Sequence, residues 1–215
     1  DFDLGTGATT LSAATTIDTS GGAGTITFGG TLDGTQNLTL TAGAGNIDFD
    51  GAVGSGGGTE LDDILIVSAG SVTADSTIEA TSLVQTAGTG TTTLDGAVTA
   101  AGAGGINIAA DAIVVNAGMN TAAGAVTFNA GDTLTMTANG DVNATGGAVN
   151  FTAANGITTA GDVTTAGTTV DYNSATTQNG AVVIDTTNGV AAGANVTFDS
   201  TVAGGQDLTI DGGTG

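Results

Sequence analysis

The sequence predicts an all-β protein whose chain winds into a β-solenoid of about nine coils, each of roughly 21–26 residues. Three observations predict this fold. A stretch near the N-terminus returns near the C-terminus without a gap, apolar residues take every second position of many short segments, and an aromatic residue recurs at about the length of one coil. Together they indicate short strands joined by glycine-rich corners and stacked coil on coil.

The internal repeat comprises Thr27–Gly45, TFGGTLDGTQNLTLTAGAG, and Thr197–Gly215, TFDSTVAGGQDLTIDGGTG. Its offset is constant (197 − 27 = 170). Apolar residues alternate with polar ones in TITF and NLTL, the period of a strand with one buried face, while GGTLDG and AGAG supply turns. The length of such a chain reflects the number of its coils and not a number of globular domains. We therefore expect residues 1–215 to form a single solenoid segment.

The rest of the chain follows the same pattern, and no capping pattern opens an amphipathic helix. The run Leu61–Ser68, LDDILIVS, is the most apolar and predicts a strand buried on both faces. The other predicted strand segments are, in order, Thr25–Gly30, Asn37–Ala42, Asn46–Asp50, Ser71–Thr86, Thr91–Thr99 and Ile106–Ala117, followed by the regular alternation of residues 124–174.

The aromatic residues predict a ladder inside the solenoid. Neighbouring members follow one another at about one coil length, from the shortest interval (49 − 28 = 21) to the longest (198 − 172 = 26). The exception is the step from Phe49 to Phe128 (128 − 49 = 79), in which Leu94 replaces a ring. An aliphatic residue two positions before each ring places the rings on the core side. The alternative is a surface platform on which sugars stack. The predicted ladder comprises Phe28, Phe49, Phe128, Phe151, Tyr172 and Phe198.

The composition excludes several functions. The chain has no Lys, Arg, His, Cys, Pro or Trp, and its formal net charge is −21. A basic groove for nucleic acid, a Ser-His-Asp or Cys-His catalytic site and a His- or Cys-ligated zinc site therefore lack their side chains. No apolar run is long enough to cross a bilayer. We expect no nucleic-acid partner and no insertion into a membrane.

The carboxylates allow two interpretations, because no side-chain cation can pair with them. Asp50, Asp95 and Asp199 each follow an inward side chain and so point outward, as would a column of oxygen ligands for calcium. The alternative is a solvated polar face with hydrogen-bonded ladders. We expect that no cofactor is required, with calcium as the candidate ion.

Two further activities compete with a structural role. Paired carboxylates could hydrolyse glycosides, but the chain lacks the Trp and the cations that would hold a sugar, so we expect no enzymatic activity. Those pairs are Asp1/Asp3, Asp48/Asp50 and Asp62/Asp63. Arrays of Thr-x-Thr on a solenoid could bind ice, but here they do not recur in every coil and they suit exposed strands in any case. These pairs are Thr25/Thr27, Thr39/Thr41, Thr91/Thr93 and Thr135/Thr137.

The repeat units resemble those of large bacterial surface and secreted proteins. TITFGGTLDGTQNLTLTAGAG, NIDFDGAVGSGGGTELDDILIVSAG and TTTLDGAVTA look like the β-strand repeats of filamentous-haemagglutinin-like and autotransporter-like adhesins. The resemblance spans most of the chain and implies a right-handed parallel β-helix, exported to the cell surface or secreted. It carries over no catalytic residue, and this chain departs from it in having no basic residue.

These observations favour a structural extracellular element, a stalk or filament-forming segment. The chain begins and ends within repeats, so we expect it to be a fragment of a longer repeat protein. The expected partners are further repeats of the same chain or other copies stacked head to tail. The alternative is an adhesin module that binds a glycan or ice.

Overall fold

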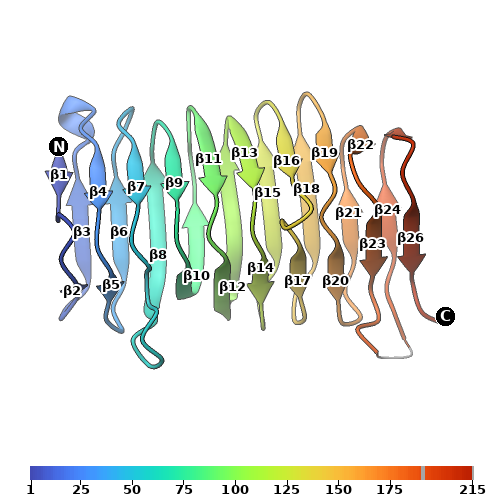
Figure 1. Ribbon diagram of the computed structural model, residues 1–215, viewed down its shortest axis with the longest axis horizontal. Helices are drawn as coiled ribbons and strands as arrows, with labels where there is room; N and C mark the ends of the chain where they lie inside the picture. Colours follow the sequence, from blue (N-terminus) through green and yellow to red (C-terminus); the bar gives the residue numbers. More distant parts are fainter. Residues whose placement is uncertain (190–191, 215) are drawn as a thin grey trace.

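The computed structural model describes residues 1–189 and 192–214 and shows a β-solenoid with three short strands per coil (Figure 1). The paired strands are parallel, and each pairs with the equivalent strands of the coils before and after it. The helix found among these residues is one short 3₁₀ turn, Ser20–Gly22. We refer to the three sides of the solenoid as faces A, B and C, in chain order within each coil.

Face A is a sheet of ten strands. In chain order these are β1 (Phe2–Asp3), β4 (Ile26–Phe28), β7 (Ile47–Phe49), β9 (Val72–Ala74), β11 (Thr91–Leu94), β13 (Ala112–Val115), β16 (Leu134–Met136), β19 (Ile157–Thr159), β22 (Thr176–Gln178) and β25 (Val202–Ala203).

Faces B and C are joined, because β10 (Ile78–Gln85) and β12 (Val98–Ala110) start on face B and continue around the corner onto face C. Face B also contains β2 (Thr9–Thr10), β5 (Leu32–Asp33), β14 (Met119–Thr121), β17 (Val142–Ala144), β20 (Val163–Thr165), β23 (Val182–Asp185) and β26 (Leu208–Asp211). Face C also contains β3 (Thr15–Asp18), β6 (Leu38–Thr41), β8 (Leu61–Ser68), β15 (Val126–Ala130), β18 (Val149–Ala153), β21 (Val170–Tyr172) and β24 (Val196–Phe198).

The coils vary in length but keep their strands in register. Ile157 pairs with Thr176 (176 − 157 = 19), whereas Thr176 pairs with Val202 across a longer coil (202 − 176 = 26). In Figure 1, faces A and B run down the front and the fainter strands of face C run up behind as the chain advances toward the C-terminus, so the winding is right-handed. The predicted right-handed parallel β-solenoid of about nine coils is confirmed, with the shortest coil slightly below the predicted range.

The core follows from the alternation within each strand. In β18, Val149, Phe151 and Ala153 are buried, whereas Asn150 and Thr152 between them point outward. Register aligns such inward residues along the rod, as Val149 does with Val126 before it and Val170 after it. Each coil therefore buries its apolar side chains against its neighbours as well as across the interior.

Strand β8 has the predicted bounds, but the prediction that both of its faces are buried is wrong. Ile64 and Ile66 are buried, whereas Asp62, Asp63 and Val67 are exposed. A sheet of a solenoid faces the core on one side and solvent on the other. The apolar run therefore includes one valine, 38% exposed, that lies on the outside.

The two copies of the sequence repeat lie on different faces. The first copy forms β4, β5 and β6 on faces A, B and C, whereas the second forms β24, β25 and β26 on faces C, A and B. Gly215, the last residue of the repeat, lies outside the described residues. The sequence unit that repeats is therefore one strand with its corner, and the three faces can exchange units.

Candidate functional surfaces

The six aromatic residues predicted to form one interior ladder lie inside the solenoid in two stacks. Phe28 and Phe49 belong to face A, with ring centroids 5.2 Å apart and an interplanar angle of 8°. The other four belong to face C near the opposite end, with neighbouring centroids 4.8–5.5 Å apart, namely Phe128, Phe151, Tyr172 and Phe198. Spacings of about one coil recur on every face, so spacing alone could not separate the two stacks.

On face A the column of rings continues with smaller side chains. Ala74, Leu94 and Val115 follow Phe49 in register, so Leu94 does take the position of a ring. Five of the six predicted rings are at most 1% exposed and Phe198 is half-buried. Their faces are covered by the neighbouring coils, which leaves no surface platform of these rings for a sugar.

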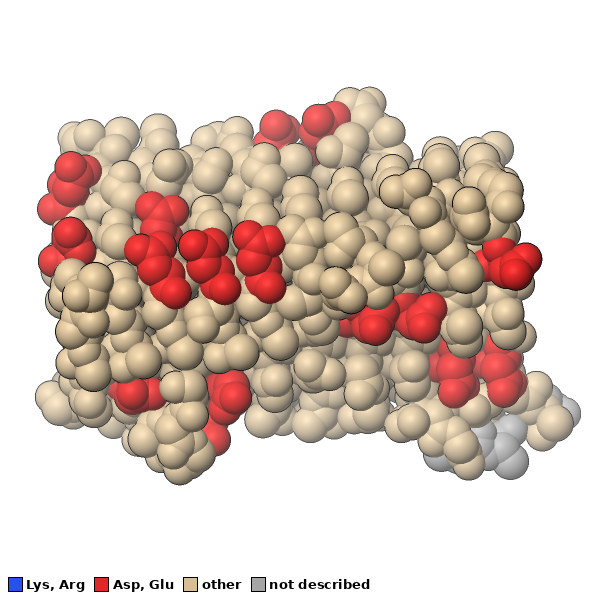
Figure 2. Space-filling view, viewed as in Figure 1, with Lys and Arg blue, Asp and Glu red and all other residues tan. Residues whose placement is uncertain are grey.

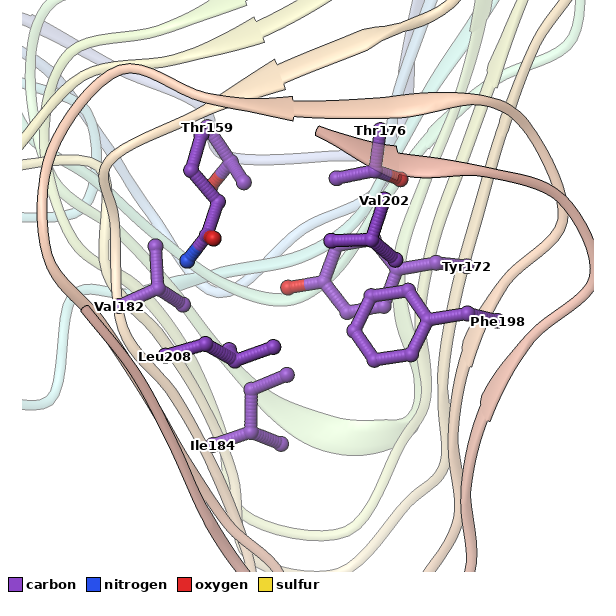
Figure 3. A pocket seen from close by; sticks show the side chains of 9 residues that line it. Thr159, Tyr172, Thr176, Val182, Ile184, Phe198, Val202 and Leu208 are labelled. Carbon is purple, nitrogen blue, oxygen red and sulfur yellow. The ribbon is translucent and has the colours of Figure 1, made fainter. Parts of the chain in front are cut away.

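Tyr172 carries a hydroxyl into an otherwise apolar stack. Its oxygen points into the interior beside Phe198 and Val202 (Figure 3). The oxygen is buried without a hydrogen-bond partner among the described residues, and the narrow cavity beside it has no room for a water molecule. Burial raises the pKa of this phenol well above its usual range, and the negative charge of Asp162 adds to that effect. The hydroxyl is therefore buried at a cost.

Tyr172→Phe should raise the free energy of unfolding by about 1 kcal/mol, because the ring stays in the stack and the unpaired hydroxyl is removed. Denaturant unfolding followed by circular dichroism measures the change. The reverse substitution, Phe151→Tyr, places a second hydroxyl in the same stack and should lower stability. A loss of stability in Tyr172→Phe would mean that the hydroxyl has a partner.

The three aspartates predicted as a calcium column do not lie together. Asp50 and Asp95 follow β7 and β11 on the same edge of face A, with Asp75 between them in the ladder. Asp199 follows β24 on face C, in the last coil. Within residues 1–189 and 192–214, no group of three or more carboxylates could hold a metal ion. Calcium binding by this protein stays a prediction.

Carboxylates gather in short rows along the rod instead of in one cluster (Figure 2). Several of them accept hydrogen bonds from the adjacent coil. Asn116 Nδ2 donates to Asp95 at 2.6 Å, and Asn155 Nδ2 donates to Asp132 at 2.6 Å. The main-chain N–H of Val183 donates to Asp162 at 2.7 Å. Amide donors thus stabilise charges for which the chain has no side-chain cation.

Asp48 points outward at the centre of β7, beside the row at the edge of face A formed by Asp50, Asp75 and Asp95. Partial burial raises the pKa of its carboxyl, and the negative charges of Asp50 and Asp75 raise it further, whereas a hydrogen bond from Thr73 lowers it. Asp185 is the opposite case. Hydrogen bonds from the Thr187 side chain and main chain lower the pKa of its carboxyl.

Asp48→Asn should stabilise the protein at pH 7. Because the folded-state pKa of Asp48 is raised, ionisation opposes folding above that pKa, and the gain from asparagine should vanish as the pH falls to about 3.8. Asp185→Asn should destabilise at pH 7, because a lowered folded-state pKa contributes stability above the ordinary aspartate range. Thermal unfolding of both variants across pH tests this opposition, and changes of the same sign would contradict it.

The carboxylates also line open grooves. One, of about 470 Å³, lies on face B and contains Asp141 and Asp162. Another, of about 350 Å³, lies at the corner between faces B and C. Its acidic residues are Glu60, Asp62 and Glu79. Main-chain N–H groups lower the pKa of Glu60, the reverse of what a general acid requires. The lowered pKa of Glu60 does not favour it as the acid of a glycoside hydrolase, and the absence of enzymatic activity stays a prediction.

The predicted Thr-x-Thr pairs divide between faces. Thr25/Thr27 and Thr91/Thr93 flank inward residues of face A, whereas Thr39/Thr41 belongs to face C. Thr135 points outward at the centre of β16 on face A, but Thr137 lies beyond the end of that strand. Face A therefore collects most of these threonines.

The ends of the rod are apolar. At the C-terminal end Val202, Leu208 and Ile210 are 41%, 37% and 46% exposed, although β26 alternates like the buried strands. At the other end Phe2, Leu4 and Leu11 are only partly covered. Each terminal strand pairs on one side, so both ends present unpaired strand edges and apolar side chains.

No helix of the described chain has the length and apolar character needed to span a bilayer. Comparison with known proteins finds no match to this chain, either among protein-family models, among curated proteins or among solved structures.

Proposed function

We propose that this chain is a structural, extracellular segment, a stalk or filament-forming part of a surface or secreted protein, and that its coils stack on further coils at both ends. The observation that carries this proposal is the pair of open, apolar ends joined by a continuous solenoid. Unpaired strand edges are templates for another strand. Contact between unlike ends is heterologous and open, so it extends into a rod instead of closing a ring.

Two further properties support a mechanical role outside the cell. Parallel ladders run the full length of the rod, so each coil is held by its neighbours. The chain also lacks Lys and Arg, which leaves trypsin-like proteases no bond to cut. Whether further coils come from the same chain or from another copy, the product is a long, stiff spacer.

Val202→Asp should reduce end-to-end association, because it places a carboxylate on the apolar C-terminal end. Val67→Asp is the matched control, since Val67 is 38% exposed against 41% for Val202 but lies on the side of the rod. Light scattering over a range of concentrations, with electron microscopy, should show rods that lengthen for the parent and the control and remain short for Val202→Asp. A monodisperse monomer at high concentration for the parent would rule out stacking between copies.

A further inference from the structure

We propose that face A binds the ordered water of an ice surface through an uncharged array of threonine hydroxyl and methyl groups. The array is a column formed by the outward residue at the centre of each face A strand from β9 to β22, and it ends at β7, where Asp48 occupies this position. Register places its members one above another from β9 to β22, namely Thr73, Thr93, Val114, Thr135, Thr158 and Thr177.

A second column lies beside the first, two residues earlier in each strand. Ser71, Thr91, Ala112 and Thr133 occupy it along the middle of the rod. Neighbouring strands are about 4.8 Å apart and residues i and i+2 of one strand about 6.6 Å apart, so the two columns form a small two-dimensional lattice. These spacings are close to repeat distances of hexagonal ice, and the parallel ladder holds them rigidly.

Three threonines in the middle of the first column do not use their hydroxyl groups in hydrogen bonds within the protein. Elsewhere threonine hydroxyls donate to main-chain carbonyls, as Thr121 does to Gly124 and Thr165 to Thr168, both at 2.6 Å. Within the described residues, the hydroxyls of Thr93, Thr135 and Thr158 form no hydrogen bond. These side chains lie between buried residues of their strands, so they point outward, and they are half-buried.

The array is uncharged in a chain that carries 21 carboxylates. Neither column contains Asp or Glu from β9 to β22. Asp75 and Asp95 lie two residues after Thr73 and Thr93 on the same side, so the part of face A without a neighbouring carboxylate at that position runs from β13 to β22. Figure 2 shows areas without carboxylates between the rows. Val114 interrupts the hydroxyls but has the shape of threonine, so the row of methyl groups continues. A charge would orient nearby water around itself, whereas hydroxyl and methyl groups at fixed spacing can hold water in a lattice.

The chemistry of face A favours ice over a glycan. Sugars are bound by exposed aromatic rings and convergent polar groups, whereas the rings of the two stacks described above lie inside the rod. A surface whose hydroxyl and methyl groups repeat from coil to coil matches a ligand that is itself repetitive. This proposal is independent of the stalk, because the array lies on the side of the rod and not on its ends.

The experiment measures uptake of the purified chain into a slowly growing ice front, together with inhibition of ice recrystallisation. The parent should be enriched in the ice and should keep the crystals small. Thr135→Asp should lose both effects, and so should Thr177→Asp, which changes an exposed position of the same column. Thr127→Asp is the matched control, because Thr127 is also half-buried and lies between two buried residues of a strand, but on face C. It should keep both effects.

Circular dichroism and thermal unfolding must show that the variants are folded. Exclusion of the parent from ice, or an equal loss in Thr127→Asp, would overturn the proposal. Face A could instead cover face A of a second copy. In that case Thr135→Asp would halve the mass measured by light scattering, and the parent itself would show no enrichment in ice. That outcome would also overturn the proposal.

Discussion

Phe151→Ala is expected to lower the free energy of unfolding by about 3–5 kcal/mol. The ring is fully buried and lies between Phe128 and Tyr172, with centroids 5.5 Å and 5.2 Å away. Truncation removes contacts with the coil on either side and leaves a cavity that the ladders of β15 and β21 prevent from closing. Equilibrium unfolding in guanidinium chloride measures the loss.

The control for this prediction is the next residue along. Thr152 points outward from β18, and its hydroxyl accepts one exposed hydrogen bond from Asn173 Nδ2 at 3.2 Å. Thr152→Ala should therefore cost less than about 0.5 kcal/mol. If the two substitutions had equal effects, the assignment of inside and outside in β18 would be contradicted.

Gly96→Ala is expected to destabilise the protein by about 3 kcal/mol, at the upper end of the overpacking range. A Cβ atom at this corner would lie 1.9 Å from the carbonyl oxygen of Ser76 in the preceding coil and 2.1 Å from its carbonyl carbon. Ser76 lies in the short corner between β9 and β10, and its main-chain atoms cannot move aside as a flexible side chain can. The added methyl group must therefore push two coils apart.

Gly21→Ala is the matched control, because it makes the same chemical change in open space. A Cβ atom at Gly21, within the 3₁₀ turn, would meet nothing within 4 Å. Its effect should be close to zero, or slightly stabilising because alanine restricts the unfolded chain. Thermal unfolding of both variants gives the comparison, and equal melting temperatures would contradict a close approach at Gly96.

Alternation within strands predicted the core well. The pattern of Val149, Asn150, Phe151 and Thr152 assigns inside and outside correctly, because a strand with one solvated face has a period of two. The same pattern could not identify the face. Inward residues of all three faces recur at about one coil length, so Phe49 and Phe128 were predicted to share a ladder although they lie on faces A and C.

Because the sequence pattern does not identify the face, it also could not show that the three predicted calcium ligands lie apart. Asp50 and Asp199 both follow an aromatic residue of a stack, yet they belong to different faces of the rod. The threonine column was missed for another reason. Its members are the centres of strands in coils of unequal length, such as Thr158 and Thr177, so no fixed interval connects them. Close approach of the main chain, as at Gly96, depends on the neighbouring coil and has no signal in one sequence.

The same repeat unit can lie on different faces of the solenoid. The position of a unit along the chain therefore determines the side of the rod toward which its outward residues point. The two copies of the repeat occupy faces A, B, C and faces C, A, B, so we expect the insertion or loss of a single strand with its corner to be compatible with a filled interior. Every later unit would nevertheless move one face around the axis. The threonines of β11 to β22 would then point in another direction, or would be split between two sides of the rod. Selection for an aligned array would therefore act on insertions and deletions whose cost to folding is small.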